Sequence, residues 1–176
     1  MKAGCGSSSE TRVFYALWPD DTVRAGLRAR AGLIPPGGQG VDERDYHLTL
    51  AFAGGVGESA LARLTHPPAE RVARFTCHLE RLEYWPKARV AVLVPSAVPA
   101  ALGTLASMLR RFVAEITGGQ GAEDYRPHVT LARAPSAPVP ARDLPPLAWE
   151  AGDYVLCASH PERHPRYHIL ARWRLA

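Results

Sequence analysis

The chain has 176 residues, of which 47% are hydrophobic, so it is long enough to fold as one domain around a substantial core. Its formal charge of +4 is compatible with a phosphate-bearing partner and indicates nothing about the fold. The sequence has no apolar run long enough to span a bilayer, and Cys5, Cys77 and Cys157 show no repeated spacing, which argues against a disulfide framework and favours a reducing cytoplasm.

The first half of the chain is predicted to begin after a flexible leader. Residues 1–10 are rich in Gly and Ser, so a single domain is expected over residues 11–176. The elements expected next are a buried strand over 13–18, an amphipathic helix after Pro19-Asp20-Asp21 with Val23, Leu27 and Ala31 on one face, a strand over 46–53, and a helical stretch over 58–74 that is broken at Pro67-Pro68.

The second half of the chain repeats this mixture of strands and a helix. Its expected elements are strands over 75–82 and 89–94 joined by a turn at Trp85-Pro86-Lys87, a long helix over 98–116 ended by Gly118-Gly119, a strand over 128–133, a Pro-rich surface connection over 135–146, and strands over 154–158 and 167–175. The order predicts an α+β fold of two similar halves.

One tetrapeptide pattern occurs once in each predicted half. His47-Leu48-Thr49-Leu50 and His128-Val129-Thr130-Leu131 both read His-x-Thr-Leu, and they lie 81 residues apart. Two such matches are expected by chance in only about one in a thousand shuffled chains of this composition, so the repeat is informative where a single match would not be. A separation close to half of the ordered chain is typical of a duplicated architecture.

Strand geometry assigns a chemistry to the repeat. Side chains alternate between the two faces of a strand, so His47 and Thr49 share one face, and His128 and Thr130 do the same in the other half. If the halves face each other, two imidazoles and two hydroxyls line one cleft. One imidazole can accept a proton from water while the other donates one to a leaving oxygen, and the hydroxyls can hold a phosphate. The pattern therefore predicts acid–base chemistry on a phosphodiester.

With these motifs, the sequence resembles the 2H phosphoesterase superfamily, and within it the bacterial RNA 2′,3′-cyclic phosphodiesterases, also called 2′-5′ RNA ligase-like proteins. The resemblance extends from about Arg12 to the C-terminus and includes the stretches 12–17, 47–52, 84–86, 126–133 and 167–173. It implies two pseudo-symmetric lobes, each an antiparallel sheet with helices, around a central cleft. It also implies cleavage that needs no metal and leaves a 2′-phosphate end. The expected partners are RNA ends or small cyclic-phosphate nucleotides, and we expect a monomer with no cofactor and no membrane association.

The resemblance implies roles for individual residues. His47 and His128 would be the catalytic pair, and Thr49 and Thr130 would hold the phosphate. Arg133 would contact phosphate too, although strict alternation places it on the face opposite His128, so that this role needs a β-bulge or a strand end. Two further assignments are Arg126 as a phosphate-binding residue at the rim and Phe14 as a ring that stacks on a base.

The roles of the two histidines are predicted from their neighbours. Arg126 and Arg133 flank His128 and would keep it neutral as the base that activates water. Arg44 and Asp45 flank His47, and the Asp45 carboxylate would raise the pKa of His47 and favour the acid that protonates the 3′-oxygen. The resemblance favours the same assignment.

Three alternatives to cyclic phosphodiesterase activity stay open. They are cleavage of 2′,5′-linked or small cyclic nucleotides, ligation of RNA ends through a 2′-5′ bond, and RNA binding without turnover. Metal-dependent chemistry is not expected, because Cys157 and His160 form at most half of a zinc site and no matching half follows.

Overall fold

The computed structural model describes residues 10–119, 125–137 and 139–176. Within them, the strands form one nine-stranded sheet that is covered by helices, which confirms the α+β class. The leader predicted for residues 1–10 lies outside the described residues except for Glu10. In the described part of the chain, no helix combines the length and apolarity needed to cross a membrane.

The elements follow one another largely as the sequence predicts. In chain order they are β1 (Thr11–Leu17), α1 (Asp21–Ala31), β2 (Gln39–Gly40), the 3-10 helix η1 (Glu43–Asp45), β3 (Leu48–Val56), α2 (Glu58–Leu64), β4 (Phe75–Trp85), β5 (Val90–Pro95), α3 (Ala100–Thr117), β6 (Val129–Arg133), β7 (Arg142–Ala151), β8 (Asp153–Ser159) and β9 (Tyr167–Arg174).

Local sequence explains where the helices begin and end. The carboxylate of Asp20 caps α1 by accepting a hydrogen bond from the amide of Val23 at 2.8 Å. Helix α3 ends at Gly118, whose φ of 69° is the left-handed conformation that glycine adopts most readily. Helix α2 stops at Leu64, just ahead of Pro67-Pro68, so the helical stretch predicted up to residue 74 is shorter than expected.

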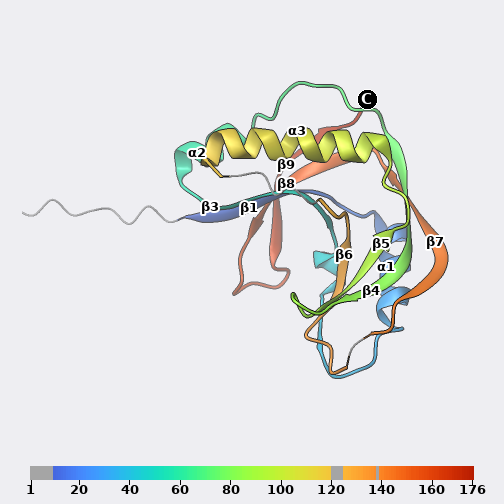
Figure 1. Cartoon of the computed structure of the whole chain (residues 1–176). Coiled ribbons are helices and arrows are strands. Elements are labelled where there is room, and N and C mark those ends of the chain that lie inside the picture. The colour runs from blue at the N-terminus through green and yellow to red at the C-terminus, as the bar shows by residue number, and fades with distance from the viewer. Residues whose placement is uncertain (1–9, 120–124, 138) are drawn as a thin grey trace, which may run out of the picture.

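The sheet consists of two halves that meet at their motif strands. Its strand order is β7-β4-β5-β6-β3-β1-β8-β9, with β2 pairing only with β6. We call β3, β1, β8 and β9 the first half and β6, β5, β4 and β7 the second half. In each half the His-x-Thr-Leu strand is innermost, and the halves are joined by one residue pair, Leu48 with Val129. The structure therefore has the two pseudo-symmetric parts expected from the sequence (Figure 1).

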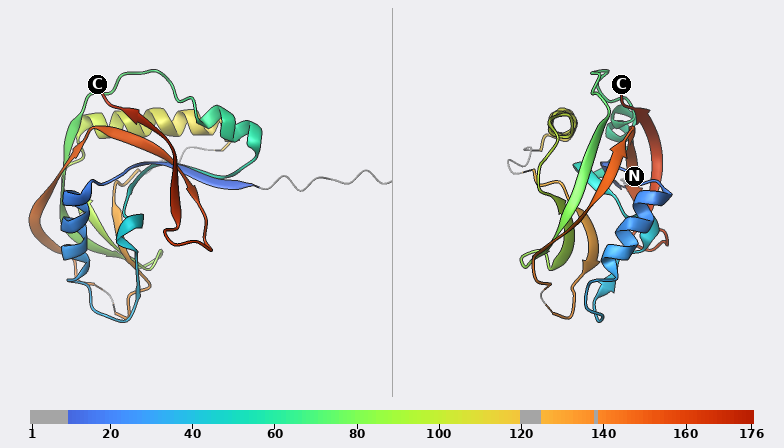
Figure 2. Two further views of the ribbon diagram at one scale, coloured as in Figure 1. Left: turned by 180° about the vertical axis from the view of Figure 1, so that it is seen from behind. Right: turned by 90° about the vertical axis from the view of Figure 1, so that its right-hand side faces the viewer.

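Each long helix packs mainly on the half of the sheet to which the strand before it does not belong. Helix α3 follows β5 and lies mainly against β3, whereas α1 follows β1 and contacts β6 and β7. The two helices are seen on different sides of the strands in Figure 2. This exchange ties the halves together, and the buried side chains of both form one continuous core.

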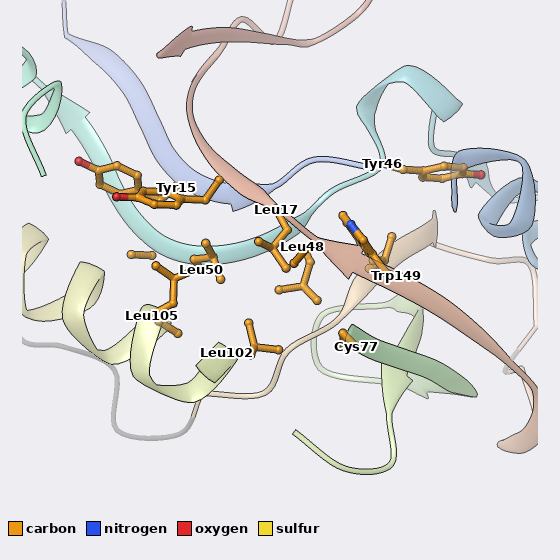
Figure 3. Close-up of a cluster of buried hydrophobic side chains, with 14 of the residues drawn as sticks. Tyr15, Leu17, Tyr46, Leu48, Leu50, Cys77, Leu102, Leu105 and Trp149 are labelled. Carbon is orange, nitrogen blue, oxygen red and sulfur yellow. The ribbon is translucent and has the colours of Figure 1, made fainter. Parts of the chain in front are cut away.

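The core explains which face of the motif strands is left for chemistry. Leu48 and Leu50 of β3 are almost completely buried and point toward Leu102 and Leu105 of α3 (Figure 3). Burial of side chains of this size contributes about 1.5–3 kcal/mol each. Since the leucines occupy the core face, the alternating residues His47 and Thr49 are directed to the other face and are only half-buried.

One prediction about the fold is wrong. The Pro-rich connection expected over residues 135–146 in fact leads into a ten-residue strand, β7, that contains Pro145 and Pro146. Prolines are tolerated there because β7 is an edge strand, with a partner only on its β4 side. An edge position is set by the topology of the sheet, which the local composition does not report.

Candidate active site

The single residue pair between the two halves determines how the motifs face each other. Leu48 lies opposite Val129 in antiparallel register. Continuing this register by one residue in each direction places His47 opposite Thr130 and Thr49 opposite His128. The two histidines are then diagonal neighbours on one face, a relation that corresponds to a Cα separation of about 7–8 Å in ordinary antiparallel geometry. A single phosphate can therefore lie between both imidazoles.

The same hydrogen bond orients both imidazole rings. Nδ1 of His47 lies 2.7 Å from the carbonyl oxygen of Asp45, and Nδ1 of His128 lies 2.8 Å from the carbonyl oxygen of Arg126. A carbonyl oxygen only accepts, so Nδ1 carries the hydrogen in each ring. The neutral rings therefore keep Nε2 free to accept a proton from a substrate or water, and a ring protonated at Nε2 can return it.

Aromatic side chains pack around the imidazoles of both motif histidines. Trp18 stacks on His47 with ring centroids 5.9 Å apart, and Tyr167 meets the same ring edge-on at 4.9 Å. On the other side of the site, Trp85 packs against His128 at 4.5 Å. These contacts support the ring orientations that the backbone carbonyls select and shield part of each imidazole from solvent.

Burial lowers the pKa of both histidines. It is the main cause of the lowering of the pKa of His47 to about 4, with the nearby charges of His128 and Arg133 as smaller causes in the same direction. Burial is also the main cause of the lowered pKa of His128, followed by the positive charges of Arg126 and Arg133. Both rings are therefore neutral near pH 7 in the free protein.

The predicted effect of the Asp45 carboxylate on His47 is wrong. That carboxylate is buried and accepts hydrogen bonds from the amides of Arg166 and Tyr167 at 3.0–3.2 Å, while only the backbone carbonyl of Asp45 reaches the His47 ring. The pKa of His47 is lowered, not raised. Neighbours in sequence therefore do not distinguish an acid from a base in this pair.

A β-bulge in each motif strand brings a further residue to the catalytic face. In β3, Ala16 and Tyr15 of β1 pair with Thr49 and Ala51, which leaves Leu50 as an extra residue. In β6, Val92 and Ala91 of β5 pair with Thr130 and Ala132, which leaves Leu131 as an extra residue. An extra residue reverses the alternation of faces that follows.

The bulges place Phe52 and Arg133 in corresponding positions. Each is the sixth residue counted from its motif histidine, and each follows two buried residues and is itself exposed. The bulge that the sequence required for Arg133 to share a face with His128 is therefore present. The charge of Arg133 acts on both histidines.

Two pockets adjoin the two motif histidines. The aromatic pocket, of about 610 Å³, is lined by His128 and Thr49 together with Phe52, Trp85 and Tyr125. The cationic pocket, of about 500 Å³, is lined by His47 and Thr130 together with Arg133, His164 and Arg166. The pockets share no lining residue, and each combines the histidine of one motif with the threonine of the other, as the register between Leu48 and Val129 requires.

The two remaining predicted site residues have different surroundings. Arg126 is exposed beside His128, where its guanidinium lies 4.9 Å from the Trp85 ring centroid and 3.0 Å from the Glu83 carboxylate. Phe14 is only 3% exposed, and its ring is covered by those of His47 and Tyr167. The structure therefore does not support base stacking by Phe14. The ring of Phe14 packs against the His47 imidazole instead.

Sequence reasoning missed the residues of the aromatic pocket. Phe52 is 56% exposed there, and Tyr125 donates a hydrogen bond from its hydroxyl to the carbonyl oxygen of Thr49 at 3.1 Å. A signal for Phe52 was present, because it occupies the same place after the first motif as Arg133 does after the second. No comparable signal identifies Tyr125.

Comparison with known proteins identifies relatives of the whole chain. The family profile described as the 2′-5′ RNA ligase superfamily matches residues 20–155. The crystal structure of Escherichia coli LigT in its apo form is 32% identical with a TM-score of 0.83, covering 96% of this chain and 99% of LigT. The crystal structure of TT0787 of Thermus thermophilus is 30% identical with a TM-score of 0.75, covering 93% and 97% of the two chains. No curated protein matches the sequence.

Crystal structures of E. coli LigT with bound ligands are equally similar to this chain. They include complexes with phosphate, 3′-AMP, ATP and NADP⁺, at identities of 29–32% and TM-scores of 0.80–0.83. A structure described only as a phosphoesterase is also 32% identical, with a TM-score of 0.83.

Proposed function

Because the chain belongs to the 2′-5′ RNA ligase superfamily, we propose that it hydrolyses 2′,3′-cyclic phosphate ends of RNA to 2′-phosphomonoesters by two-histidine acid–base catalysis. The observation that carries this proposal is the matched pair of imidazoles. Both have Nδ1 bound by a backbone carbonyl, which leaves both Nε2 atoms available at positions that are diagonal across one strand pair.

The reaction needs one proton removed and one supplied. Water attacks phosphorus, and Nε2 of His128 takes its proton as the new P–O bond forms. The bond from phosphorus to the 3′-oxygen breaks, and His47 protonates that oxygen from Nε2, which leaves the phosphate on the 2′-oxygen. This assignment of roles rests on the family resemblance, since the two rings have equivalent hydrogen bonds.

Charge at the phosphate is stabilised by groups around the two rings. In this mechanism the hydroxyls of Thr49 and Thr130, which line the two pockets, donate hydrogen bonds to non-bridging oxygens, and Arg133 of the cationic pocket supplies a positive charge. An anionic substrate also raises the pKa of a neighbouring imidazole, so binding favours the protonated acid that the free protein lacks at pH 7.

We assign the terminal nucleoside to the aromatic pocket. The volume of this pocket, about 610 Å³, lies within the range of small-molecule sites, and the exposed ring of Phe52 can stack on a base. Arg126, at the rim of this pocket, is partly neutralised by Glu83, so we assign it a weaker contact with phosphate than Arg133.

The test is to incubate the protein with an RNA that ends in a 2′,3′-cyclic phosphate, in the presence of EDTA, and to locate the phosphate of the product. We expect a 2′-phosphate and undiminished turnover in EDTA. Activity that disappears in EDTA and returns with a divalent metal would contradict the metal-free mechanism. A 3′-phosphate product would show that the bond from phosphorus to the 2′-oxygen breaks instead.

The same assay separates the rival functions. An RNA bearing a 5′-hydroxyl can be added as an acceptor, and a 2′,5′-linked dinucleotide can be offered as an alternative substrate. A joined product would support ligation, and preferred cleavage of the 2′,5′-linked dinucleotide would support a 2′,5′-phosphodiesterase. Tight binding of RNA without any product would support the non-catalytic alternative.

A further inference from the structure

The cationic pocket contains a guanidinium that the proposed chemistry does not use. Arg166 lies in the loop between β8 and β9 and lines this pocket with His47, Arg133 and His164. Its Nε atom is shielded from solvent and has no hydrogen-bond partner among the residues that the structure describes. Since the side chain lines the pocket and this donor has no acceptor, Arg166 is suited to turn toward and bind an acceptor that a ligand brings into the pocket.

The backbone of Arg166 is held in place. The Asp45 carboxylate accepts hydrogen bonds from the amide of Arg166 at 3.0 and 3.1 Å and from that of Tyr167 at 3.2 Å. The carbonyl oxygen of Arg166 accepts a further bond from the amide of His160 at 2.8 Å, which closes the loop. The side chain is thus presented from a fixed position next to His47, whose ring is oriented by the same Asp45.

The acidic residues of the cationic pocket form no ion pair with its arginines among the described residues. The Asp45 carboxylate is occupied by backbone amides, and that of Asp42 is bound to Arg44 at 2.6 Å. Within the described ranges of the chain, neither Arg133 nor Arg166 forms an ion pair. In the aromatic pocket, by contrast, Arg126 is paired with Glu83. The positive charge available to a ligand is therefore concentrated on the His47 side.

One reacting phosphate does not need all of this charge. Arg133 follows the second motif directly and acts on both histidines, so it serves the phosphate that lies between them. Arg166 belongs to a different element and carries its guanidinium 5.8 Å from the Tyr167 ring centroid, on the flank of the catalytic pair. A second anionic group of the substrate, adjacent to the reacting phosphate, would pair with the Arg166 guanidinium.

We propose that Arg166, with His164 beside it, binds the phosphodiester immediately upstream of the reacting cyclic phosphate, so that the preferred substrate is an oligonucleotide end and not a mononucleotide. This proposal rests on the proposed function and names the substrate class of the same site. The upstream phosphodiester is joined to the same terminal ribose through its 5′-carbon, and it carries one negative charge. A charge-assisted hydrogen bond to a guanidinium is the contact expected for it.

The experiment compares two substrates that differ in one charge. One is a diadenosine with a 2′,3′-cyclic phosphate end and a natural internal linkage, and the other has a neutral methylphosphonate at that linkage. We expect the wild-type protein to favour the charged substrate about tenfold in kcat/KM, the range expected for a hydrogen bond to a charged group. In Arg166→Gln this ratio should fall to near one.

Arg163→Gln is the matched control. Arg163 is an exposed arginine of the same loop that does not line the cationic pocket, so its substitution removes the same charge and should leave the tenfold ratio in place. Equal ratios for the two substrates in the wild type would overturn the proposal. So would an Arg166→Gln variant that keeps the ratio, or an Arg163→Gln variant that loses it as well.

Failure of the proposed function can be recognised separately. If the wild-type protein hydrolyses neither diadenosine nor adenosine 2′,3′-cyclic phosphate, the hydrolase assignment fails. The subsite is then tested by calorimetric binding of the matching 2′-phosphate products with natural and methylphosphonate linkages. A roughly tenfold difference in Kd that Arg166→Gln removes would support the upstream subsite without any turnover, and equal affinities would overturn it.

Discussion

The two sides of the catalytic cleft have the same backbone and different side chains. Each has a histidine bound to a carbonyl two residues earlier, a threonine two residues later and a bulge at the following leucine. After the bulge the two sides differ. Phe52 lines the aromatic pocket on one side, and Arg133, at the corresponding position on the other side, lines the cationic pocket. In the proposed function the symmetric part transfers protons, and the asymmetric part is expected to determine how a substrate is oriented.

The two sets of residues are expected to have separate roles, one in catalysis and the other in the orientation of the substrate. Two equivalent imidazoles suffice to move protons across a phosphodiester, but they do not distinguish a base from a phosphate. The aromatic pocket offers ring surface and a neutralised arginine, and the cationic pocket offers two arginines without ion pairs within the described residues. Substitutions on the symmetric part should therefore affect turnover, and those on the asymmetric part should affect selectivity.

The largest effect is expected from the catalytic histidines. His47→Ala and His128→Ala should each lower kcat by about 10²–10⁴-fold, the usual contribution of a positioned general acid or base. Both variants should stay folded, because their side chains lie on the cleft face and the core face is intact. Steady-state rates on a cyclic-phosphate substrate and circular dichroism would check both statements.

A substrate with an activated leaving group distinguishes the two roles. Such a group needs no protonation, so His47→Ala should be largely rescued and His128→Ala should not. Rescue of His128→Ala alone would exchange the roles of acid and base. If His47→Ala unfolds while the remaining folded protein keeps its full activity, His47 is structural and the mechanism is wrong.

Arg133 comes next, because it supplies charge to the reacting phosphate. Arg133→Gln should lower kcat/KM by on the order of 10–10³-fold, as expected for the loss of a donor to a developing negative charge. Arg142→Gln serves as a control, since Arg142 is an exposed arginine that donates to the carbonyl oxygen of Leu33, away from both pockets. Equal losses in the two variants would show that only the overall charge matters.

Phe52 tests the other member of the asymmetric pair. Phe52→Ala should raise KM about tenfold with little change in kcat, because stacking of one base on an aromatic ring contributes about 1–3 kcal/mol to binding. Phe52→Tyr retains the ring and should behave like the wild type. If Phe52→Ala lowers kcat and leaves KM unchanged, the base does not lie in the aromatic pocket.

The smallest effect concerns stability in acid. The folded-state pKa of His47 is about 4, whereas an unfolded histidine has a pKa near 6.5. Between these pH values the unfolded chain binds more protons than the folded protein. The free energy of unfolding therefore falls as the pH falls through this window. His47→Gln removes the effect. Between pH 7 and 4.5 the wild-type free energy of unfolding should therefore fall by on the order of 2 kcal/mol more than that of the variant.

Urea denaturation at the two pH values would measure this difference. His128→Gln should act in the same direction, since the pKa of His128 is also lowered by burial. Identical pH dependence in the wild type and both variants would mean that neither ring is desolvated as the structure indicates. The two imidazoles would then be equivalent in their hydrogen bonds but not shown to be equivalent in their burial.

Sequence alone determined the features that depend on local pattern. The repeat of His-x-Thr-Leu, the alternation that places Leu48 in the core and His47 on the opposite face, and the division into two similar halves all follow from residue order, because strand periodicity is a property of the local chain. The condition that Arg133 needs a bulge was also available in advance. The proline content of residues 135–146 led to the wrong prediction of a surface connection, because β7 tolerates prolines only through its place at the edge of the sheet.

Only the tertiary structure decided how these local pieces combine. The pairing of Leu48 with Val129 sets the relation of the two histidines, and the binding of the Asp45 carboxylate to the amides of Arg166 and Tyr167 removes its expected influence on the pKa of His47. Both contacts join residues more than 80 positions apart in the chain. Such pairings depend on which surfaces the folded core brings together, and no local pattern encodes them.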